Sequence, residues 1–138
     1  MKRIVSAPEF AHYPDDWHLS PIVDTGEFLF FSGQTGFHPG GFVDPDPERQ
    51  FRDVFSFLQS NLKAAGLTLA DVVEMTSYHI DMRQHMQLFL RVKDEFIFAP
   101  YPAWTAIGVS ALMTEGTLLE IRVIAQRPSA PPGPLPHP

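Results

Sequence analysis

The sequence predicts an α+β domain in which a mixed β-sheet carries two helices on one face. Two segments have the apolar spacing of amphipathic helices, and several shorter runs alternate or are rich in β-branched and aromatic residues. Along the chain these segments follow the order strand, helix, strand, helix, strand, strand, which implies one mixed sheet with both helices on the same side. The chain of 138 residues is long enough for one domain with a single hydrophobic core.

The first half of the chain contains two expected strands and the clearest helix. A short strand is expected at residues 3–6 and a Phe-rich strand at residues 27–32, which Gly33 ends. Asp46 is the expected N-cap of the helix and Pro47 its first residue, because Pro is well accommodated in the first turn. The apolar stripe of this helix consists of Phe51, Val54, Phe55, Leu58, Leu62 and Ala65.

The second helix lies further along the chain. Gly66 is the expected C-cap of the first helix, and a brief capped turn then precedes a strand at residues 72–80. Asp81 and Gln84 have the spacing of a capping box and open the second helix, which ends before Pro100. Its apolar positions are Met82, His85 or Met86, Phe89, Val92 and Phe96.

Two further strands, at residues 103–110 and 118–126, complete the predicted sheet. The single domain is therefore expected to span residues 1–126. Residues 127–138 are half proline, so we expect a disordered or polyproline-like tail outside the fold.

The last two strands have two different faces. The residues predicted to lie under the helices are Ala103, Thr105, Ile107 and Val109 in one strand and Leu119, Ile121, Val123 and Ala125 in the other. The opposite face is predicted to carry Trp104, Ala106, Gly108 and Ser110 beside Leu118, Glu120, Arg122 and Ile124. Two helices cannot cover both faces of a sheet, and this second face is too apolar for plain solvent. We therefore expect an oligomer that packs these faces together and leaves a crevice between copies.

The composition argues against several classes of protein. A net charge of −6, with scattered Lys and Arg residues, argues against nucleic-acid and membrane-surface partners. The chain has no Cys, no signal-peptide pattern and no run of about 20 apolar residues, so we expect a cytoplasmic protein. The usual nucleotide-binding, metalloprotease and serine-hydrolase motifs are absent. The only closely spaced candidate metal ligands are His79, Asp81 and His85, and we expect them to bind no metal.

Glu120 is the most informative candidate for chemistry. A carboxylate in the middle of an apolar strand is costly to bury unless it is paired or used. One interpretation is an ion pair with Arg122, Arg91 or a neighbouring chain; the other is a carboxylate of raised pKa that positions or deprotonates water. Ser32 and Gly33 either stop a strand or present a hydroxyl and exposed backbone to a ligand.

Four segments together resemble the reactive intermediate deaminase (Rid, YjgF-like) family. These segments are "FFSGQTG" at residues 30–36, "FRDVFSFLQSNLKAAGLTLADVVEMTSYHIDM" at 51–82, "PYPAWTAIGV" at 100–109 and "EGTLLEIRVIA" at 115–125. The resemblance implies a chorismate-mutase-like homotrimer with clefts between subunits. It also implies cofactor-independent hydrolysis of small-molecule enamines and imines, such as 2-aminoacrylate, to ammonia and a keto acid. Such chemistry needs an oriented substrate, a placed water and stabilised charge.

The resemblance also assigns site residues, with two departures from the family pattern. Ser32 and Gly33 match the family's cleft "SG", and Glu120 matches the Glu thought to orient water. The family's "PAR" reads "PAW" here, so Trp104 replaces an Arg that usually binds the substrate carboxylate, and Phe89 replaces an Asn that assists it. Trp offers an apolar plane and one N–H instead of a fork of donors, and the loss costs about 1.5–3 kcal/mol.

We therefore expect an enamine or imine deaminase whose substrate is larger or more apolar than 2-aminoacrylate. Glu120 is the expected catalytic residue. The expected substrate-binding residues are Ser32, Gly33, Trp104, Thr105, Phe89 and Trp17, of which Trp17 would close the cleft. An alternative interpretation is a non-catalytic trimer that binds a small molecule, and a second alternative for Trp104 is packing at the subunit interface without a ligand.

Overall fold

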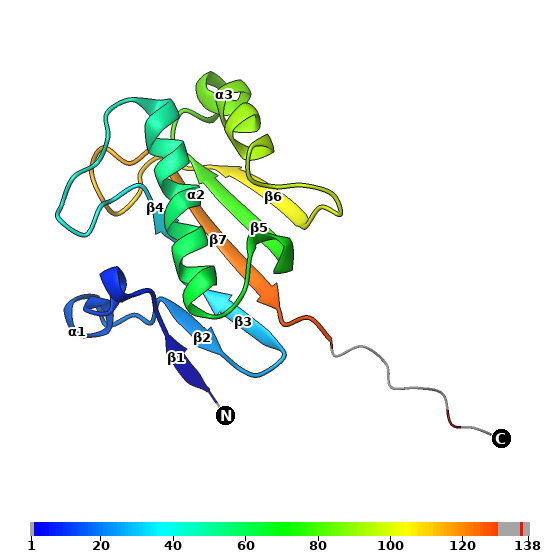
Figure 1. The fold of residues 1–138 in the computed structure, drawn as a ribbon. Coiled ribbons are helices and arrows are strands. Elements are labelled where there is room, and N and C mark those ends of the chain that lie inside the picture. Colours follow the sequence, from blue (N-terminus) through cyan, green and yellow to red (C-terminus); the bar gives the residue numbers. More distant parts are fainter. Residues whose placement is uncertain (1, 130–135, 137–138) are drawn as a thin grey trace.

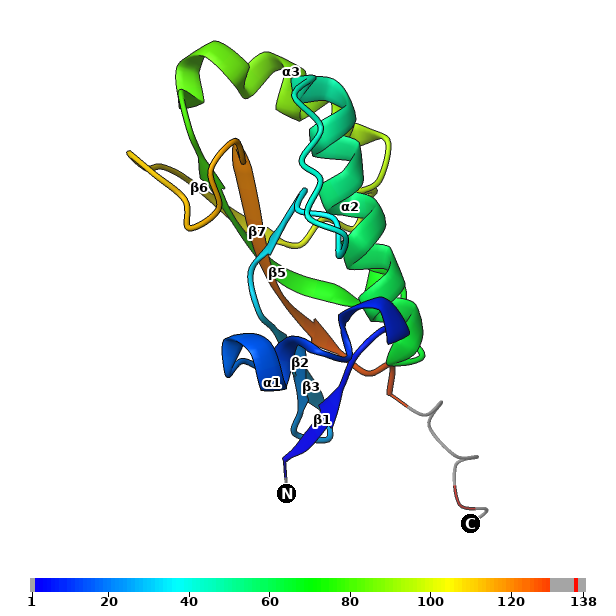
Figure 2. The same ribbon diagram turned by 90° about the vertical axis from the view of Figure 1, so that its left-hand side faces the viewer.

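The structure is a computed structural model that describes residues 2–129 and 136, and it confirms the predicted α+β class. Two long helices, α2 (Pro47–Ala64) and α3 (Met82–Asp94), lie on one side of a mixed sheet (Figures 1 and 2). Most of the proline-rich tail at residues 127–138 lies outside the described residues, so its disorder stays a prediction. Among the helices formed by the described residues, none is both long enough and apolar enough to span a membrane.

The described residues form a seven-stranded sheet with β7 near its centre. The strands are β1 (Arg3–Val5), β2 (Ile22–Asp24), β3 (Phe28–Phe31), β4 (Gln34–Thr35), β5 (Val72–His79), β6 (Ala103–Gly108) and β7 (Leu119–Gln126). Their order is β1-β2-β3-β7-β5-β6, and β4 also pairs with β7. The β5–β6 pair is parallel and the other pairs are antiparallel, so the sheet is mixed as predicted.

Sequence patterns missed three short elements, which are β2, β4 and the helix α1 (Tyr13–Trp17). Elements of two to five residues are too short to show a hydrophobic period. Helix α1 lies on the other side of the strands from α2 (Figure 2). Two 3-10 turns, Pro8–Phe10 and Leu69–Asp71, complete the described fold, and the second is the predicted capped turn.

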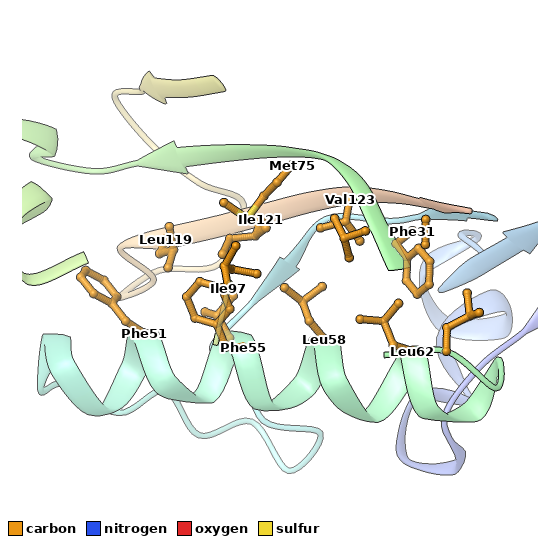
Figure 3. Packing of buried hydrophobic residues seen from close by; sticks show 14 of the residues in the cluster. Phe31, Phe51, Phe55, Leu58, Leu62, Met75, Ile97, Leu119, Ile121 and Val123 are labelled. Atoms are coloured by element: carbon orange, nitrogen blue, oxygen red, sulfur yellow. The ribbon is translucent and has the colours of Figure 1, made fainter. Parts of the chain in front are cut away.

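Helix α2 begins and packs as its sequence predicts. The Asp46 carboxylate accepts a hydrogen bond from the Arg49 N–H at 3.0 Å, and Pro47 lies in the first turn. The apolar stripe faces β7 and contributes Phe51, Phe55 and Leu58 to the core (Figure 3). On the sheet side the core contains Leu119, Ile121, Val123 and Ala125, the face of β7 that the alternation predicts. Burial of these side chains is the main stabilising contribution to the fold.

Helix α3 does not begin with the predicted capping box. Asp81 has a left-handed backbone conformation, with φ of 49°, and its side chain makes no capping hydrogen bond. The prediction was wrong because the chain turns sharply between β5 and α3, and this conformation directs the Asp81 side chain away from the first N–H groups of the helix. Phe89 and Val92 are nevertheless buried in the core, as the periodicity indicates.

The predicted faces of β6 were wrong. Trp104 lies opposite Met75 and Ala106 opposite Ser77 in the parallel β5–β6 register, so these residues share the helix-covered face. Thr105 and Ile107 lie on the opposite face of the sheet, away from α2 and α3, which we call the open face. Ile107 is 40% exposed there. The reason is that small residues on β6 let α3 approach closely: a Cβ on Gly108 would lie 3.4 Å from the Met82 Sδ atom.

The open face of the sheet is partly apolar, as predicted for its β7 half. Exposed large apolar side chains on it are Ile4, Phe28, Phe30 and Ile107. Glu120, Arg122 and Ile124 belong to the same face, since their neighbours on β7 are buried under the helices. Exposed apolar side chains of this size are uncommon together on a solvated sheet face.

The Asp24 carboxylate links Arg3, the first residue of β1, to Arg127, which follows β7, by hydrogen bonds, and it makes the stability of the fold depend on pH. Its carboxylate is nearly buried and accepts hydrogen bonds from the Gly26 N–H and from Arg127 and Arg3. Arg127, which the sequence places at the start of the tail, is thus bound to the domain. The backbone N–H of Gly26 and then the Arg127 guanidinium lower the pKa of Asp24 from 3.8 to about 2.

Stability contributed by Asp24 is therefore expected above pH 3.8 and lost as the pH falls towards 2. Asp24→Asn should lower the Tm at neutral pH and reduce the further fall in Tm over this acid range. Thermal unfolding at a series of pH values measures both effects, and Asp94→Asn, at an exposed site on α3, is the control. An unchanged acid dependence in the Asp24 variant would contradict the prediction.

Candidate functional site

A cavity of about 270 Å³ lies beside Glu120 on the open side of the sheet. Its wall comes from α1, the β3–β4 region, the loop between β6 and β7, and β7 itself. The lining residues are Tyr13, Trp17, Leu19, Ser32, Gly33, Gln34, Thr35, Phe37, Met113, Thr114 and Glu120. Four of the predicted site residues, Glu120, Ser32, Gly33 and Trp17, thus lie together.

Glu120 is placed in this cavity by strand pairing. Its Cα pairs with that of Thr35 on β4 and that of Tyr78 on β5, so β7 holds it between two strands. The carboxylate is half-buried, and burial raises its pKa above the ordinary value of 4.5. Among the described residues it forms no ion pair within 4.0 Å, so the interpretation as an ion pair with Arg122 or Arg91 is not supported within one chain.

Gly33 permits the close approach of the Glu120 carboxylate. A Cβ built on Gly33 would lie 2.8 Å from Cδ and 3.0 Å from Oε1 of Glu120, closer than real Cβ contacts. The carboxylate therefore packs directly on the backbone of Gly33, and any side chain at that position must displace it. This contact explains physically why the serine is followed by glycine.

The Ser32 hydroxyl is already committed as a donor. Its Oγ donates to the carbonyl of Ser20 at 2.6 Å, and the Ser32 N–H donates to the carbonyl of Pro21. The hydroxyl therefore offers only lone pairs to a ligand. These two bonds also fix the chain after α1 against the end of β3, which places the aromatic side chain of Trp17 at the cavity.

The other predicted site residues form a second group, on β6 and α3. The Trp104 Nε1–H donates to the Ser77 Oγ at 2.8 Å, and the Ser77 Oγ lies 2.7 Å from the His79 Nε2. Phe89 is fully buried, and its ring centroid lies 5.9 Å from that of Trp104, so the Phe89 ring packs against the indole. Trp104 is 36% exposed at the edge of the sheet, and the Lys93 ammonium lies 4.7 Å from its ring centroid.

This second group does not line the Glu120 cavity. Trp104 and Phe89 lie on the helix-covered face, whereas Glu120 lies on the open face. Thr105 is exposed on the open face but is separated from β7 by β5. Burial lowers the pKa of His79 to about 4, so the imidazole is neutral at neutral pH and its ring packs edge-on against Phe89.

Sequence reasoning missed several residues of the cavity wall. Tyr13, Phe37 and Met113 lie in segments with no periodic pattern, and only the folded chain brings them to Glu120. A concentration of aromatic residues in the N-terminal segment is the one signal that could have indicated Tyr13. Among the described residues there is no group of three or more His, Asp or Glu side chains that could hold a metal ion.

Comparisons with known proteins give consistent matches. The family model described as "Endoribonuclease L-PSP" matches residues 14–127. The RutC family protein YjgH of Escherichia coli strain K12 is 41% identical over 110 residues, which cover 79% of this chain and 82% of the relative. A solved structure of protein YJGH has a TM-score of 0.83 and 36% identity, covering 94% of this chain and 98% of that one.

A structure of E. coli TdcF with bound serine is also similar to this chain. Its TM-score is 0.72 and its identity 30%, with 80% of this chain and 88% of that one covered.

Proposed function

The chain belongs to the Endoribonuclease L-PSP family, which includes YjgF, RutC and Rid proteins, and from this membership we propose that it is a cofactor-independent deaminase of reactive enamines and imines. Its substrate is larger or more apolar than 2-aminoacrylate. The observation that carries the proposal is Glu120, a half-buried carboxylate that packs on Gly33 in a cavity to which Tyr13, Trp17 and Phe37 also contribute. The bound serine in the TdcF structure supports a small molecule as the ligand.

The proposed reaction is hydrolysis of a C=N bond. An enamine first takes a proton on carbon and loses one from nitrogen, which converts it to the imine. Water then bonds to the imine carbon while the C=N electron pair moves to nitrogen, and Glu120 takes a proton from the water and delivers it to that nitrogen. The carbinolamine collapses as oxygen forms the C=O bond, its proton moves to nitrogen, and the C–N bond breaks to release ammonia.

A homotrimer is part of the proposal, because it would complete the site. The exposed apolar side chains of the open face, such as Phe30 and Ile107, support its burial against other copies of the chain. In such an assembly the edge strand β6 of one copy brings Trp104 to the Glu120 cavity of the next. Trp104 would then form the apolar wall at a cleft between protomers.

Nucleic acid is not the proposed substrate, despite the name of the family model. The net charge of −6 gives the protein no general attraction for a phosphate backbone. Among the described residues, the cavity is lined by one acidic residue and by no Lys, Arg or His. Both observations favour a small-molecule substrate.

The proposal is tested by measuring the hydrolysis of a panel of imines by a variant in which the contact between Gly33 and Glu120 is changed. Imines generated by amine or amino-acid oxidation are followed by their ultraviolet absorbance, with ammonia as the product. Gly33→Ala should lower kcat/KM by about tenfold to a hundredfold, since a displacement of about 1 Å can cost this much. Gly40→Ala, where a Cβ meets nothing within 4 Å, is the matched control. Equal rates in the two variants would contradict the proposed role of Glu120.

A second candidate function is a non-catalytic trimer that binds a small molecule. The observation that favours it is the indole of Trp104, whose only donor is used by Ser77 and is not free to hold a substrate. A ligand that raises the Tm, with no wild-type turnover across the imine panel, would support this candidate over the enzyme.

A further inference from the structure

Trp104, Ser77 and His79 form a chain of hydrogen bonds that runs from β6 to β5. The Trp104 indole donates to the Ser77 Oγ atom at 2.8 Å, and the same Oγ atom lies 2.7 Å from the His79 Nε2 atom. Ser77 and His79 are two residues apart on β5, so both side chains lie on the helix-covered face with the indole. Both residues are buried, with exposed fractions of 0% and 1%. Solvent therefore competes little for these two hydrogen bonds.

The direction of these hydrogen bonds follows from the groups that can donate. The indole Nε1–H can only donate, so the Ser77 oxygen accepts it. If the Ser77 hydroxyl then donates to the neutral His79 ring at Nε2, only the His79 Nδ1–H is left without a partner among the described residues. The reverse direction, from an Nε2–H group to Ser77, leaves both the Nδ1 lone pair and the Ser77 hydrogen unpaired. The order indole, hydroxyl, imidazole is therefore favoured, and hydrogen bonds in such a series strengthen one another.

Residues of α3 hold the same two rings by packing. The Phe89 ring lies edge-on to the His79 ring, with 4.7 Å between centroids, and is tilted by 40° against the Trp104 ring. The Lys93 ammonium lies 4.7 Å from the Trp104 ring centroid. Trp104 belongs to the edge strand β6, yet its indole is restrained by a hydrogen bond from β5 and by contacts from α3.

We infer that Ser77 and His79 are positioning residues that hold the Trp104 indole in one orientation, with its N–H turned into the protomer and its ring at the β6 edge. In one respect this inference rests on the proposed function, in which the Trp104 ring is the apolar wall of a substrate cleft. A wall that is already ordered loses little conformational entropy when a ligand packs against it. Ser77 and His79 would then act on substrate binding through Trp104, without touching the substrate.

The indole N–H signal in a proton–nitrogen correlation spectrum of the isotope-labelled full chain tests this positioning. The chain has two Trp residues, so Trp17→Phe identifies the signal of Trp104. Ser77→Ala should speed hydrogen exchange of the Trp104 indole at least about fivefold, the change that corresponds to one net hydrogen bond. His79→Phe keeps an aromatic ring beside Phe89 and removes Nε2, so it should speed the exchange less than Ser77→Ala does. Thr76→Val removes a hydroxyl from the same strand on the opposite face and is the matched control.

Equal exchange rates of the Trp104 indole in Ser77→Ala and Thr76→Val would overturn the inference. A general loss of stability would speed the exchange of buried backbone amides as well, whereas a loss of positioning affects the indole selectively. If Ser77→Ala does not fold, unchanged indole exchange in His79→Phe would overturn the inference instead.

Kinetics on the imine panel test whether this positioning serves substrate binding. Ser77→Ala should raise KM at least about fivefold and leave kcat within about twofold, because Trp104 contributes binding equally before and in the transition state. An unchanged KM would overturn the role in substrate binding. A wild-type protein without turnover would contradict the proposed deaminase activity, and the exchange rates would still decide whether Ser77 and His79 position Trp104.

Discussion

Glu120→Gln is expected to lower kcat/KM for imine hydrolysis by about 10²- to 10⁴-fold, the range that a positioned general base contributes. The substitution keeps the size of the side chain and removes its ability to take a proton from water. The fold should survive, because Glu120 makes no ion pair among the described residues and contributes no buried apolar surface. Steady-state rates on the imine panel measure the loss, and Glu115→Gln, at an exposed position in the loop before β7, is the control.

The pH profile separates this role from a structural one. Burial raises the pKa of Glu120 above 4.5, and only the ionised carboxylate can act as a base. The wild-type kcat/KM should therefore fall as the pH drops through a value above 4.5, and this acid limb should be absent from the residual rate of Glu120→Gln. Burial also raises the pKa of Tyr13, which lines the same cavity, so Tyr13 stays protonated and does not produce the limb. An acid limb that persists in the variant would contradict the assignment.

The longer elements were predictable because each carries several independent signals. Helix α2 combines an N-cap, a Pro in the first turn and an apolar stripe, and all three are found in the structure. Strand β7 alternates strictly, and its buried face is the predicted one. Strand β6 alternates as well, but an edge strand is not constrained on both sides. The assignment of its faces depended on its register with β5, which no local pattern encodes.

The candidate site was predictable in part for the same reason. Glu120 stands out because a carboxylate in an apolar strand is unusual, and its position follows from the alternation of β7. The sequence singles out Trp104, but the environment of its indole depends on Ser77 and Phe89, from two other elements. The aromatic wall from Tyr13 and Phe37 depends on irregular segments. Contacts of this kind are properties of the folded chain.

Gln50 holds the loops around the site through a side chain that is completely buried. Its Nε2 donates to the carbonyls of Asp44 and Gly116 at 3.0 Å each, and its Oε1 accepts from the Leu118 N–H at 2.7 Å. These three backbone groups belong to the loop before α2, the loop between β6 and β7, and the residue that precedes β7. The second of these loops also carries Met113 and Thr114 of the cavity wall.

Gln50→Leu is accordingly expected to lower the free energy of unfolding by about 3 kcal/mol, since it removes three hydrogen bonds that are each worth about 1 kcal/mol net. For a domain of this size the loss corresponds to a fall in Tm of roughly 10 °C. Leu fills most of the space of Gln, so the effect reports lost hydrogen bonds rather than a cavity. Gln59→Leu, at an exposed position on the same helix, is the matched control. If the two variants unfold at the same temperature, Gln50 does not hold these loops, and the shape of the Glu120 cavity must depend on other contacts.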